Sequence, residues 1–504
     1  MLKKNCFFVQ LFETFFFMDS LHYIYNILAF TVIITYFAGI IYLVVDTVLE
    51  NRSPLKTISW VLVLVLLPVV GFMFFIFFGQ NFRKEKIIAR NVLKNHEIFT
   101  SIATEQIAEL KEDEILQDTQ LEEKRQLVTL LLNNSNSVIT SSNSIKILHN
   151  GQETFEAIIS ALENAKSFIH LEYYIFADDK IGRAIINILK RKAKEGVEVR
   201  IIVDDVGSWE LKKPFYKEMR AAQIDIYSFL EVHFPKLTSK INYRNHRKII
   251  VVDGTVGFMG GINIADRYVE GHKEYGIWRD THLRIEGDAI NLLQTVFLTD
   301  WYFVSHKELS DKKYFPYKIP TGDKIIQIVS SGPDSDWHAI MMGIFQAISS
   351  AKKYVYIATP YFMPTEGVLL AMKTAALGGI DVKVILPQKS DAFITLRSTQ
   401  SYIRELLEAG IKIYFYHKGF IHSKVLIIDD FVSIVGSANM DFRSFEQNFE
   451  ISAFIYDEQT AKELNKTFDE DLSNSVQITQ DKWNNRTQID KWKESFARLV
   501  GPLL

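Results

Sequence analysis

Two stretches of this chain carry the same polar residue types at the same spacings. The first holds His246, Lys248, Asp253 and Asn263. The second repeats the set as His422, Lys424, Asp429 and Asn439. In both copies the histidine lies two residues before the lysine, the lysine five before the aspartate, and the aspartate ten before the asparagine. Composition alone would not place these residues in register twice.

Paired imidazole, ammonium and amide groups suit displacement at a phosphodiester. Its negative charge repels nucleophiles, so the reaction needs a positioned attacking group on one side and a proton donor for the leaving oxygen on the other. Imidazole, with an unperturbed pKa of about 6.5, serves either purpose near neutral pH. The lysines and asparagines would hold the phosphate oxygens and stabilise the transition state. No metal and no other cofactor is expected, because no acid or thiol near His417 and His422 completes a zinc-ligand set.

A simpler interpretation is that the motif histidines cap elements or fill the core and the motif lysines are solvated. Repetition of the whole set argues against it, because clustered titratable groups mark functional sites. Asp253 and Asp429 lie at predicted strand ends, where they are expected to orient a neighbour rather than to react. A further acid also repeats, since Glu274 and Glu450 each follow the motif asparagine by eleven residues.

The sequence places each motif on a hairpin of strands. The apolar run 249–252 predicts a strand buried on both faces, and His246 and Lys248, two residues apart, project from one face of it. The next residues, Asp-Gly in one copy and Asp-Asp in the other, predict tight turns into second strands at 256–259 and 431–435. Glycines after these strands would let each asparagine return toward its His-Lys pair.

A longer internal repeat surrounds the motifs. Apolar runs at 168–176 and 354–362 are each followed by a helical stretch and a second run, at 196–204 and 379–387. Strands alternating with helices imply a largely parallel, helix-covered sheet. The sequence therefore predicts an α/β fold in which two similar domains form a pseudo-two-fold pair with one shared site.

The N-terminal region is apolar enough to enter a bilayer. Two runs without charged residues, at about 25–45 and 58–79, each approach the twenty residues that a helix needs to span the hydrocarbon core. They are apolar all round, unlike the amphipathic helices of a soluble fold, so they predict a two-helix transmembrane hairpin. Pro68 lies inside the second run and is expected to kink it.

The charges that flank these runs predict the orientation of the hairpin. Lys3 and Lys4 precede the first run, and four further cations follow the second, namely Arg83, Lys84, Lys86 and Arg90. Both ends of the hairpin should therefore face the cytoplasm. A cleaved signal peptide is the rival interpretation of the first run, but no small-residue cleavage site follows it.

The predicted domain limits follow from these features. They are an N-terminal extension at 1–22, the transmembrane hairpin at 23–94, a charged and solvated linker helix at 95–135, a first α/β domain at 136–322 and a second at 323–504. The sequence leaves open whether Met18 is the true start.

Composition narrows the function further. The chain has 504 residues and a net charge of only −3, which disfavours a nucleic-acid partner. Its single cysteine, Cys6, cannot form an internal disulfide. Near the C-terminus, Ile489, Trp492, Phe496 and Leu499 share one helical face. This pattern favours an amphipathic helix that closes the second domain, and leaves a membrane-surface helix as the alternative.

The motif His-x-Lys-x4-Asp-x6-Gly-x2-Asn, present twice, resembles that of the phospholipase D superfamily. Further segments resemble the bacterial cardiolipin synthases in particular: residues 50–54, 243–248, 278–281, 439–445 and the C-terminal residues 498–504. The resemblance covers nearly all of the chain after Leu21. It implies two phospholipase D-like domains and a membrane enzyme with no cofactor.

The resemblance also implies a reaction and roles for the motif residues. A phosphatidyl group would pass from one phosphatidylglycerol to another through a phosphohistidine, giving cardiolipin and glycerol. His246 is favoured as the nucleophile and His422 as the acid and then the base. The motif lysines and asparagines would bind the phosphate, and the aspartates would support the site. The enzyme would be a multi-pass protein of the bacterial plasma membrane with cytoplasmic catalytic domains, and a homo-oligomer stays open.

Other functions use the same residues. A phospholipase D would use water as the acceptor and release phosphatidic acid. A nuclease is disfavoured by the low net charge. A membrane scaffold without activity is disfavoured because both motifs are intact.

Overall fold

The structure is a computed structural model that describes residues 3–49, 54–75, 94–111, 119–232, 242–317 and 320–500. These residues form two compact units. One contains the N-terminal helices, and the other contains all elements from Lys94 onward.

The N-terminal unit consists of three helices, α1 (Lys3–Leu49), α2 (Pro54–Leu66) and α3 (Pro68–Phe74). Helices α2 and α3 are separated at Leu67, because Pro68 has no backbone N–H for a continuous helix and disfavours helical geometry in the residue before it. The predicted kink is therefore confirmed. Ile40 of α1 is buried against Leu64 and Phe75, so the helices pack together.

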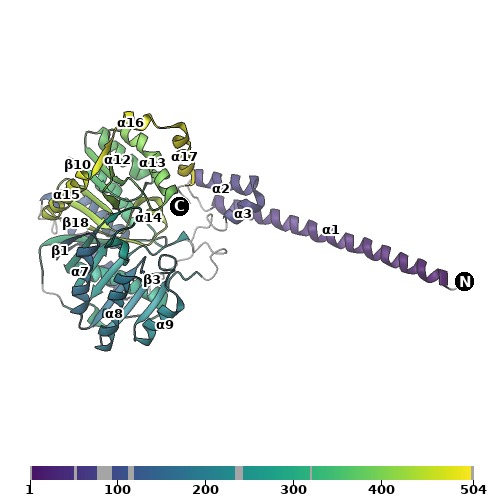
Figure 1. Ribbon diagram of the computed structural model, residues 1–504, viewed down its shortest axis with the longest axis horizontal. Helices are drawn as coiled ribbons and strands as arrows, with labels where there is room; N and C mark the ends of the chain where they lie inside the picture. The colour runs from purple at the N-terminus through teal and green to yellow at the C-terminus, as the bar shows by residue number, and fades with distance from the viewer. Residues whose placement is uncertain are drawn as a thin grey trace. The chain divides into compact units, whose positions relative to one another are not determined.

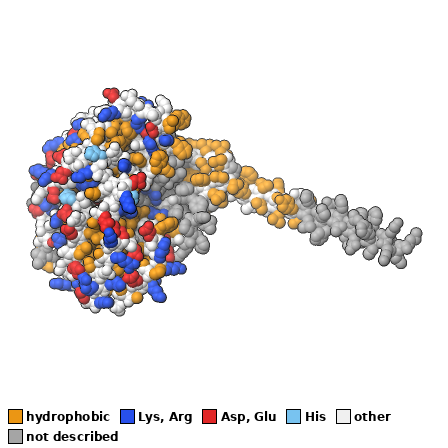
Figure 2. Space-filling model, in the orientation of Figure 1, with side chains coloured by type: hydrophobic (Ala, Val, Ile, Leu, Met, Phe, Trp, Pro, Cys, Tyr) orange, Lys and Arg blue, Asp and Glu red, His pale blue; other side chains and the backbone are white. Residues whose placement is uncertain are grey.

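Only the stretch Tyr23–Leu49 of α1 is long and apolar enough to cross a membrane among the described residues. Figure 2 shows hydrophobic side chains along the described part of this helix. The second predicted span is divided between α2 and α3, and its residues 76–79 lie outside the described chain, as do the cations from Arg83 to Arg90. The two-helix transmembrane hairpin is thus not confirmed.

The predicted linker helix is not simply a solvated segment. It contains α4 (Lys94–Lys111), α5 (Thr119–Glu122) and α6 (Arg125–Ser135). In α6 the four residues Leu127, Val128, Leu131 and Leu132 are buried in the main core. The prediction of a solvated helix was wrong for this part, because an apolar stripe at helical spacing immediately follows the charged segment Glu122–Arg125.

The first α/β half begins at β1 and ends with α10 and a short 3₁₀ turn. Its strands are β1 (Thr140–His149), β2 (Phe168–Tyr173), β3 (Glu198–Asp204), β4 (Asp225–Phe229), β5 (Lys248–Val252), β6 (Val256–Gly260), β7 (Ile277–Arg279) and β8 (Thr281–Gly287). Its helices are α7 (Asn150–Glu163), α8 (Lys180–Lys194), α9 (Lys213–Ala221), α10 (Ala289–Ser305) and the 3₁₀ turns η5 (Asp266–Tyr268) and η6 (Lys312–Tyr314).

The second half repeats this order with a longer C-terminal part. Its strands are β9 (Lys324–Ser331), β10 (Tyr354–Ala358), β11 (Phe362–Met363), β12 (Asp381–Pro387), β13 (Lys412–Tyr416), β14 (Gly419–Ile421), β15 (Val425–Ile428), β16 (Val432–Gly436), β17 (Met440–Asp441), β18 (Glu450–Tyr456) and β19 (Ser475–Ile478). Its helices are α11 (Ala339–Ser349), α12 (Glu366–Leu377), α13 (Phe393–Glu408), α14 (Phe442–Glu446), α15 (Glu458–Ser473), α16 (Gln480–Asn484) and α17 (Gln488–Val500).

One sheet joins the two halves, in the order β19-β13-β12-β10-β15-β16-β18-β9-β1-β8-β6-β5-β2-β3-β4. Apart from β19, the order reads the same way outward from the β9–β1 pair, so each strand has a counterpart in the other half. Figure 1 shows the two halves side by side, the first in teal and the second in green to yellow. The predicted pair of similar α/β domains is confirmed.

The prediction of a largely parallel sheet was wrong. Among the described strands, only β2–β3, β3–β4, β10–β12 and β12–β13 of the fourteen neighbouring pairs in this sheet are parallel. Four of the antiparallel pairs arise because each motif folds as a tight hairpin and the strand after it returns beside that hairpin. The parallel strands are those linked by helices, as crossover geometry requires.

The hairpin turns have the predicted residues. Asp253 and Gly254 both have positive φ, at 51° and 64°, and so do Asp429 and Asp430, at 54° and 57°. Such turns match the right-handed twist of the flanking strands and favour Asp, Asn and Gly. The strands β5 and β15 are buried along their full length, as the apolar runs predicted.

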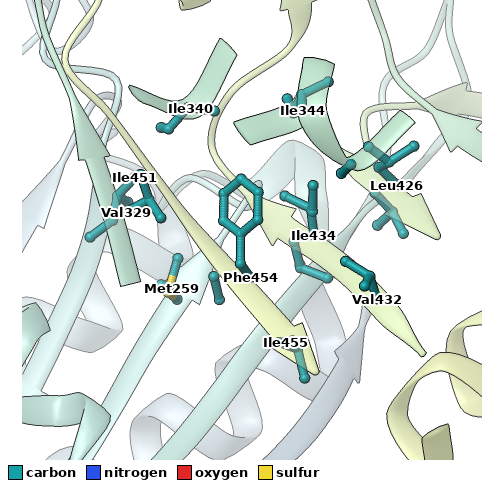
Figure 3. Close-up of a cluster of buried hydrophobic side chains, with 14 of the residues drawn as sticks. Met259, Val329, Ile340, Ile344, Leu426, Val432, Ile434, Ile451, Phe454 and Ile455 are labelled. Carbon is teal, nitrogen blue, oxygen red and sulfur yellow. The ribbon is translucent and has the colours of Figure 1, made fainter. Parts of the chain in front are cut away.

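The main hydrophobic core crosses the boundary between the halves. Figure 3 shows Phe454 among Ile340, Ile344 and Ile434 of the second half, with Met259 of the first half nearby. A second cluster lies within the first half, around β2 and α8. The shared core fixes the position of one motif relative to the other.

Candidate active site

The two motifs meet at the boundary between the halves. His246 lies two residues before β5, which begins at Lys248, and His422 and Lys424 lie immediately before β15. All four side chains are buried, with at most 8% of each residue exposed. The backbone N–H of His246 donates to the carbonyl of Phe449, and that of His422 to the carbonyl of Arg279, so each motif is attached to the opposite half.

A carboxylate from the second half orients the histidine of the first. Nδ1 of His246 lies 3.0 Å from Oε2 of Glu450, which also accepts a hydrogen bond from the Ser437 hydroxyl. Burial raises the pKa of the Glu450 carboxyl, but His246 and Lys248 outweigh it and the net pKa is lowered. The ionised carboxylate only accepts, so Nδ1 carries the proton and Nε2 keeps its lone pair.

A carboxylate from the first half contacts the second histidine at the equivalent atom, although burial raises the pKa of this carboxyl. Nδ1 of His422 lies 2.7 Å from Oδ2 of Asp280, whose other oxygen accepts from the N–H of Thr281. Lys424 donates to the carbonyl of His422 and lies 2.9 Å from its Nδ1. Trp278 packs beside the imidazole, with ring centroids 5.2 Å apart.

The structural counterpart of Glu450 is therefore Asp280, not Glu274. Gly436 pairs with Ser452 on β18, and Gly260 pairs with His282 on β8, so Glu450 and Asp280 each lie two residues before the strand partner of the motif glycine. The intervening chain is six residues longer in the first half, which shifts the acid in sequence but not in space.

Glu274 itself is exposed, and its backbone N–H bonds to the His272 ring. The equal spacing of Glu274 and Glu450 after their asparagines therefore has no structural meaning. In the sequence, Asp280 could have been found from the motif glycine and from the strand that pairs with it, because the acid lies two residues before the strand partner of the glycine.

The lysines complete a cluster of basic groups. Nζ of Lys248 donates to the carbonyl of His246 over 2.6 Å, and its ammonium lies 5.3 Å from the Tyr174 ring centroid. Tyr174 also packs edge-on against His246. Each lysine is thus held beside its own histidine, as the spacing of two on a strand predicted.

Burial and mutual repulsion lower the pKa of every basic group in this cluster. Burial is the largest cause, and it brings the pKa of His246 to about 4, of Lys248 to about 7 and of Lys424 to about 8, against the opposing charges of Glu450 and Asp280. Burial and the neighbouring lysines lower the pKa of His422 well below its usual value. A bound anion would relieve this repulsion, so the site is built to receive negative charge.

The two motif asparagines are buried at the site but differ in their bonds. Oδ1 of Asn263 accepts from the N–H of Ile175, and its Nδ2 donates to the Tyr268 hydroxyl over 2.7 Å. Asn439 is 5% exposed and its buried Oδ1 has no partner among the described residues. Neither amide side chain bonds to the opposite half among the described residues.

The motif aspartates lie at the far end of their strands from the histidines. Asp253 accepts from the backbone N–H groups of Lys166, Ser167 and Phe168, and fixes the start of β2. Asp429 accepts in the same manner from the three residues that lead into β10, namely Lys352, Lys353 and Tyr354. Their carboxylates hold the strands of each half together.

Buried ion pairs support the site from behind. Arg247 pairs with Asp300 of α10 and donates to the carbonyl of Glu450 over 3.3 Å. Arg279 pairs with Asp471 of α15 over 2.9 Å. Arg247 follows His246 and Arg279 precedes Asp280, so α10 and α15 hold the segments that carry the two His–carboxylate pairs. Within the described residues no three His, Cys, Asp or Glu side chains gather as a metal-ligand set.

The chain is similar to known proteins over most of its length. A family model described as "Cardiolipin synthase, PLD-like domain" matches residues 158–301 and 344–472, and one described as a phospholipase D-nuclease N-terminal region matches residues 38–80. A cardiolipin synthase of Halalkalibacterium halodurans is 42% identical over 94% of both chains. Cardiolipin synthase 2 of Bacillus cereus is 43% identical over 90% of this chain and 88% of its own.

A crystal structure of similar fold is that of a phosphatidylserine synthase of Haemophilus influenzae Rd KW20, with a TM-score of 0.58 at 14% identity. The match covers 77% of this chain and all of that chain. At this identity the likeness concerns the fold alone. The two family-model matches and the long alignments with relatives above 40% identity agree with the paired motifs, and the chain belongs to the cardiolipin synthase family of phospholipase D-like proteins.

Proposed function

We propose that this protein is a phosphatidyltransferase that joins two phosphatidylglycerol molecules into cardiolipin and releases glycerol. The observation that carries the proposal is the pair of buried histidines, each oriented through Nδ1 by a carboxylate of the opposite half. Such a pair offers two imidazole nitrogens to one phosphodiester, one for attack and one for proton transfer. Membership of the cardiolipin synthase family supports the choice of substrate.

In the first step Nε2 of His246 attacks the phosphorus of the first phosphatidylglycerol. The bond from phosphorus to the glycerol headgroup oxygen breaks, and His422 donates a proton to that oxygen. Glycerol leaves and a phosphatidyl group stays on His246. Binding of the anionic phosphodiester raises the pKa of His422, because the charge repulsion that lowers it is then compensated.

In the second step the hydroxyl of another phosphatidylglycerol attacks the phosphohistidine. His422, now neutral, accepts the hydroxyl proton, and the bond between phosphorus and His246 breaks to release cardiolipin. Lys248 and Lys424 hold the non-bridging oxygens throughout, since their ammonium groups lie beside the two histidines. Asn439 would donate its amide N–H groups to a phosphate oxygen, whereas Asn263, whose amide is hydrogen-bonded at both ends, chiefly supports the site. Asp253 and Asp429 act as supports of the fold.

A lipid hydrolase is the second candidate, since water in place of the second alcohol would give phosphatidic acid. The two are separated by incubating the purified protein with phosphatidylglycerol vesicles and identifying the lipids by mass spectrometry. Cardiolipin with an equal amount of glycerol supports the synthase. Phosphatidic acid with glycerol would make the protein a phospholipase D, and neither product would refute both.

The membrane arrangement is part of the proposal. The span Tyr23–Leu49 and the second run, divided at Pro68, would form a multi-pass hairpin in a bacterial plasma membrane, with the α/β halves in the cytoplasm. Support comes from the packing of Ile40 against Leu64 and Phe75, which brings the two runs together. The same proposal divides the α/β part into its two domains between residues 322 and 323. It also includes assembly of the protein into a homo-oligomer.

A further inference from the structure

Helix α17 presents its apolar side chains to the outside. Ile489, Trp492, Phe496 and Leu499 are 67%, 76%, 68% and 78% exposed. Figure 2 shows hydrophobic side chains at the place that α17 occupies in Figure 1. The helix is amphipathic, as the sequence predicted. Its apolar face, however, does not pack against the second domain but is exposed.

The opposite side of α17 holds it on the protein. Ala497 and Glu494 are buried, and Glu494 pairs with Arg486. Arg498 donates to Glu405 of α13 over 2.8 Å and lies over the Tyr402 ring. Polar contacts and small residues thus dock the helix, and the large apolar residues are left for another partner.

This apolar face continues onto the start of α13. Phe393 and Ile394 are 63% and 45% exposed. Arg397, one turn further along α13, stacks on Phe393 and pairs with Asp490 of α17 over 3.4 Å. The six apolar side chains of α17 and α13 are therefore linked through one arginine; we call them the α17–α13 patch.

A series of contacts connects the patch with the active site. Two residues before Phe393, Asp391 accepts a hydrogen bond from the Tyr361 hydroxyl over 2.7 Å. Tyr361 packs against the aromatic cluster that contains Trp278, and Trp278 packs beside His422. The patch and His422 are thus joined by a short series of contacts that passes through Trp278 of the first half.

An exposed aromatic residue lies at the corresponding place in the first half. The loop between β3 and α9 corresponds to the loop between β12 and α13, and it carries Trp209, which is 67% exposed. Ser208 in this loop donates to the carbonyl of Tyr174, whose ring packs on His246. Each half therefore places an exposed aromatic side chain in or just after the corresponding loop, and contacts through neighbouring residues connect it with that half's own histidine.

We propose that the α17–α13 patch, with Trp209, rests on the surface of a phospholipid bilayer and holds the active site close to the lipid headgroups. Large exposed apolar patches mark interaction sites, and Trp and Phe on an amphipathic helix suit the boundary between headgroups and acyl chains. The flanking cations Lys491 and Lys493 suit an anionic lipid surface. The choice of a bilayer rests on the proposed function, since a phosphatidylglycerol substrate resides there.

Fluorescence quenching tests this contact without need of turnover. In the full chain carrying Cys6→Ser, a single cysteine introduced by Phe496→Cys is labelled with an environment-sensitive fluorophore. The protein is reconstituted into vesicles of phosphatidylglycerol and phosphatidylcholine. The matched control is Leu377→Cys at the end of α12, which is 73% exposed and precedes the start of β12, at the ends of the strands opposite to His422. Quenching by acyl-chain-brominated lipid and by aqueous iodide is then compared.

We expect brominated lipid to quench the probe at position 496 at least three times more strongly than the probe at 377, and iodide to show the reverse order. Equal iodide quenching at both positions would overturn the proposal. Protection at 496 from both quenchers would also overturn it, because a second copy or another segment of this chain would then cover the face. A wild-type protein that makes no cardiolipin would refute the proposed function and leave the quenching result intact.

A kinetic measurement supplies the functional side of the test. The double variant Trp492→Ser, Phe496→Ser should lower the rate of cardiolipin formation from vesicles at least fivefold. With phosphatidylglycerol dispersed in detergent the same variant should match the wild type, which also excludes misfolding. Equal rates with vesicles would contradict a role of the patch in reaching substrate.

Discussion

Replacing Glu450 by glutamine removes the charge that orients His246 but keeps the shape of the side chain. Glu450 is fully buried, and its carboxylate accepts from Nδ1 of His246 and from the Ser437 hydroxyl. A glutamine can present its NH₂ group to Nδ1, which would favour the tautomer with the proton on Nε2 and block attack. The variant should therefore fold normally and react slowly.

The size of the effect follows from the lost hydrogen bond. A hydrogen bond to a charged group contributes about 1.5–3 kcal/mol. Since about 1.4 kcal/mol corresponds to a tenfold change in rate, kcat should fall about 10- to 150-fold. Asp280→Asn should have a loss of the same order, because Asp280 holds His422 over 2.7 Å in the equivalent position.

The matched control is Glu274→Gln. Glu274 follows its motif asparagine at the same spacing as Glu450. It is exposed, and Asp280 is the acid of its half that contacts a motif histidine. Rates of cardiolipin formation are measured for the three variants with phosphatidylglycerol in detergent, and thermal unfolding confirms the fold. A Glu450→Gln enzyme as active as Glu274→Gln would refute the cross-half orientation of the histidines.

Three further predictions concern the surroundings of the site. A Cβ at position 261 would collide with the carboxylate of Asp280, so Gly261→Ala should lower kcat at least tenfold with a smaller effect on unfolding temperature; an unchanged kcat would contradict the close approach. Inorganic phosphate or tungstate should bind with proton uptake between pH 7 and 8, and its affinity should fall above pH 8, because Lys248 and Lys424 have pKa values of about 7 and about 8 that a bound anion raises. Calorimetry in buffers of different ionisation enthalpy measures the proton uptake. A constant affinity from pH 6.5 to 9 would contradict this prediction. Asp253→Ala removes the acceptor for three backbone N–H groups and should cost about 1–3 kcal/mol of unfolding free energy in denaturant titrations, while the folded fraction keeps its activity; a large loss of kcat at full stability would instead give Asp253 a direct role.

The sequence predicted those parts of the site that depend on local geometry. His246 and Lys248 both pack on the Tyr174 ring, because residues two apart in an extended segment share a face. The hairpin after β5 forms because Asp253 and Gly254 accept positive φ. These features need only a few consecutive residues, and repetition in the second half made them reliable.

Other features depended on distances through space. Asp280 could not be recognised from spacing, because extra residues in the first half displace it from the position that Glu450 marks. The antiparallel majority of the sheet followed from the return strands β8 and β18, whose partners lie across hairpins. The outward-facing apolar side of α17 arises because Arg498 and Glu494, not the large apolar residues, dock the helix.

In the proposed mechanism the two histidines serve one phosphodiester with different roles, His246 as nucleophile and His422 as acid and base. This mechanism is tested by adding phosphatidylglycerol with ³²P in its phosphate to His246→Ala and His422→Ala proteins, quenching in alkali and locating protein-bound label by peptide mass spectrometry. We expect acid-labile label on His246 in the His422→Ala protein, none on the His246→Ala protein, and no cardiolipin from either. Label on His422 in the His246→Ala protein would reverse the roles, and substantial cardiolipin from either variant would contradict the two-histidine account.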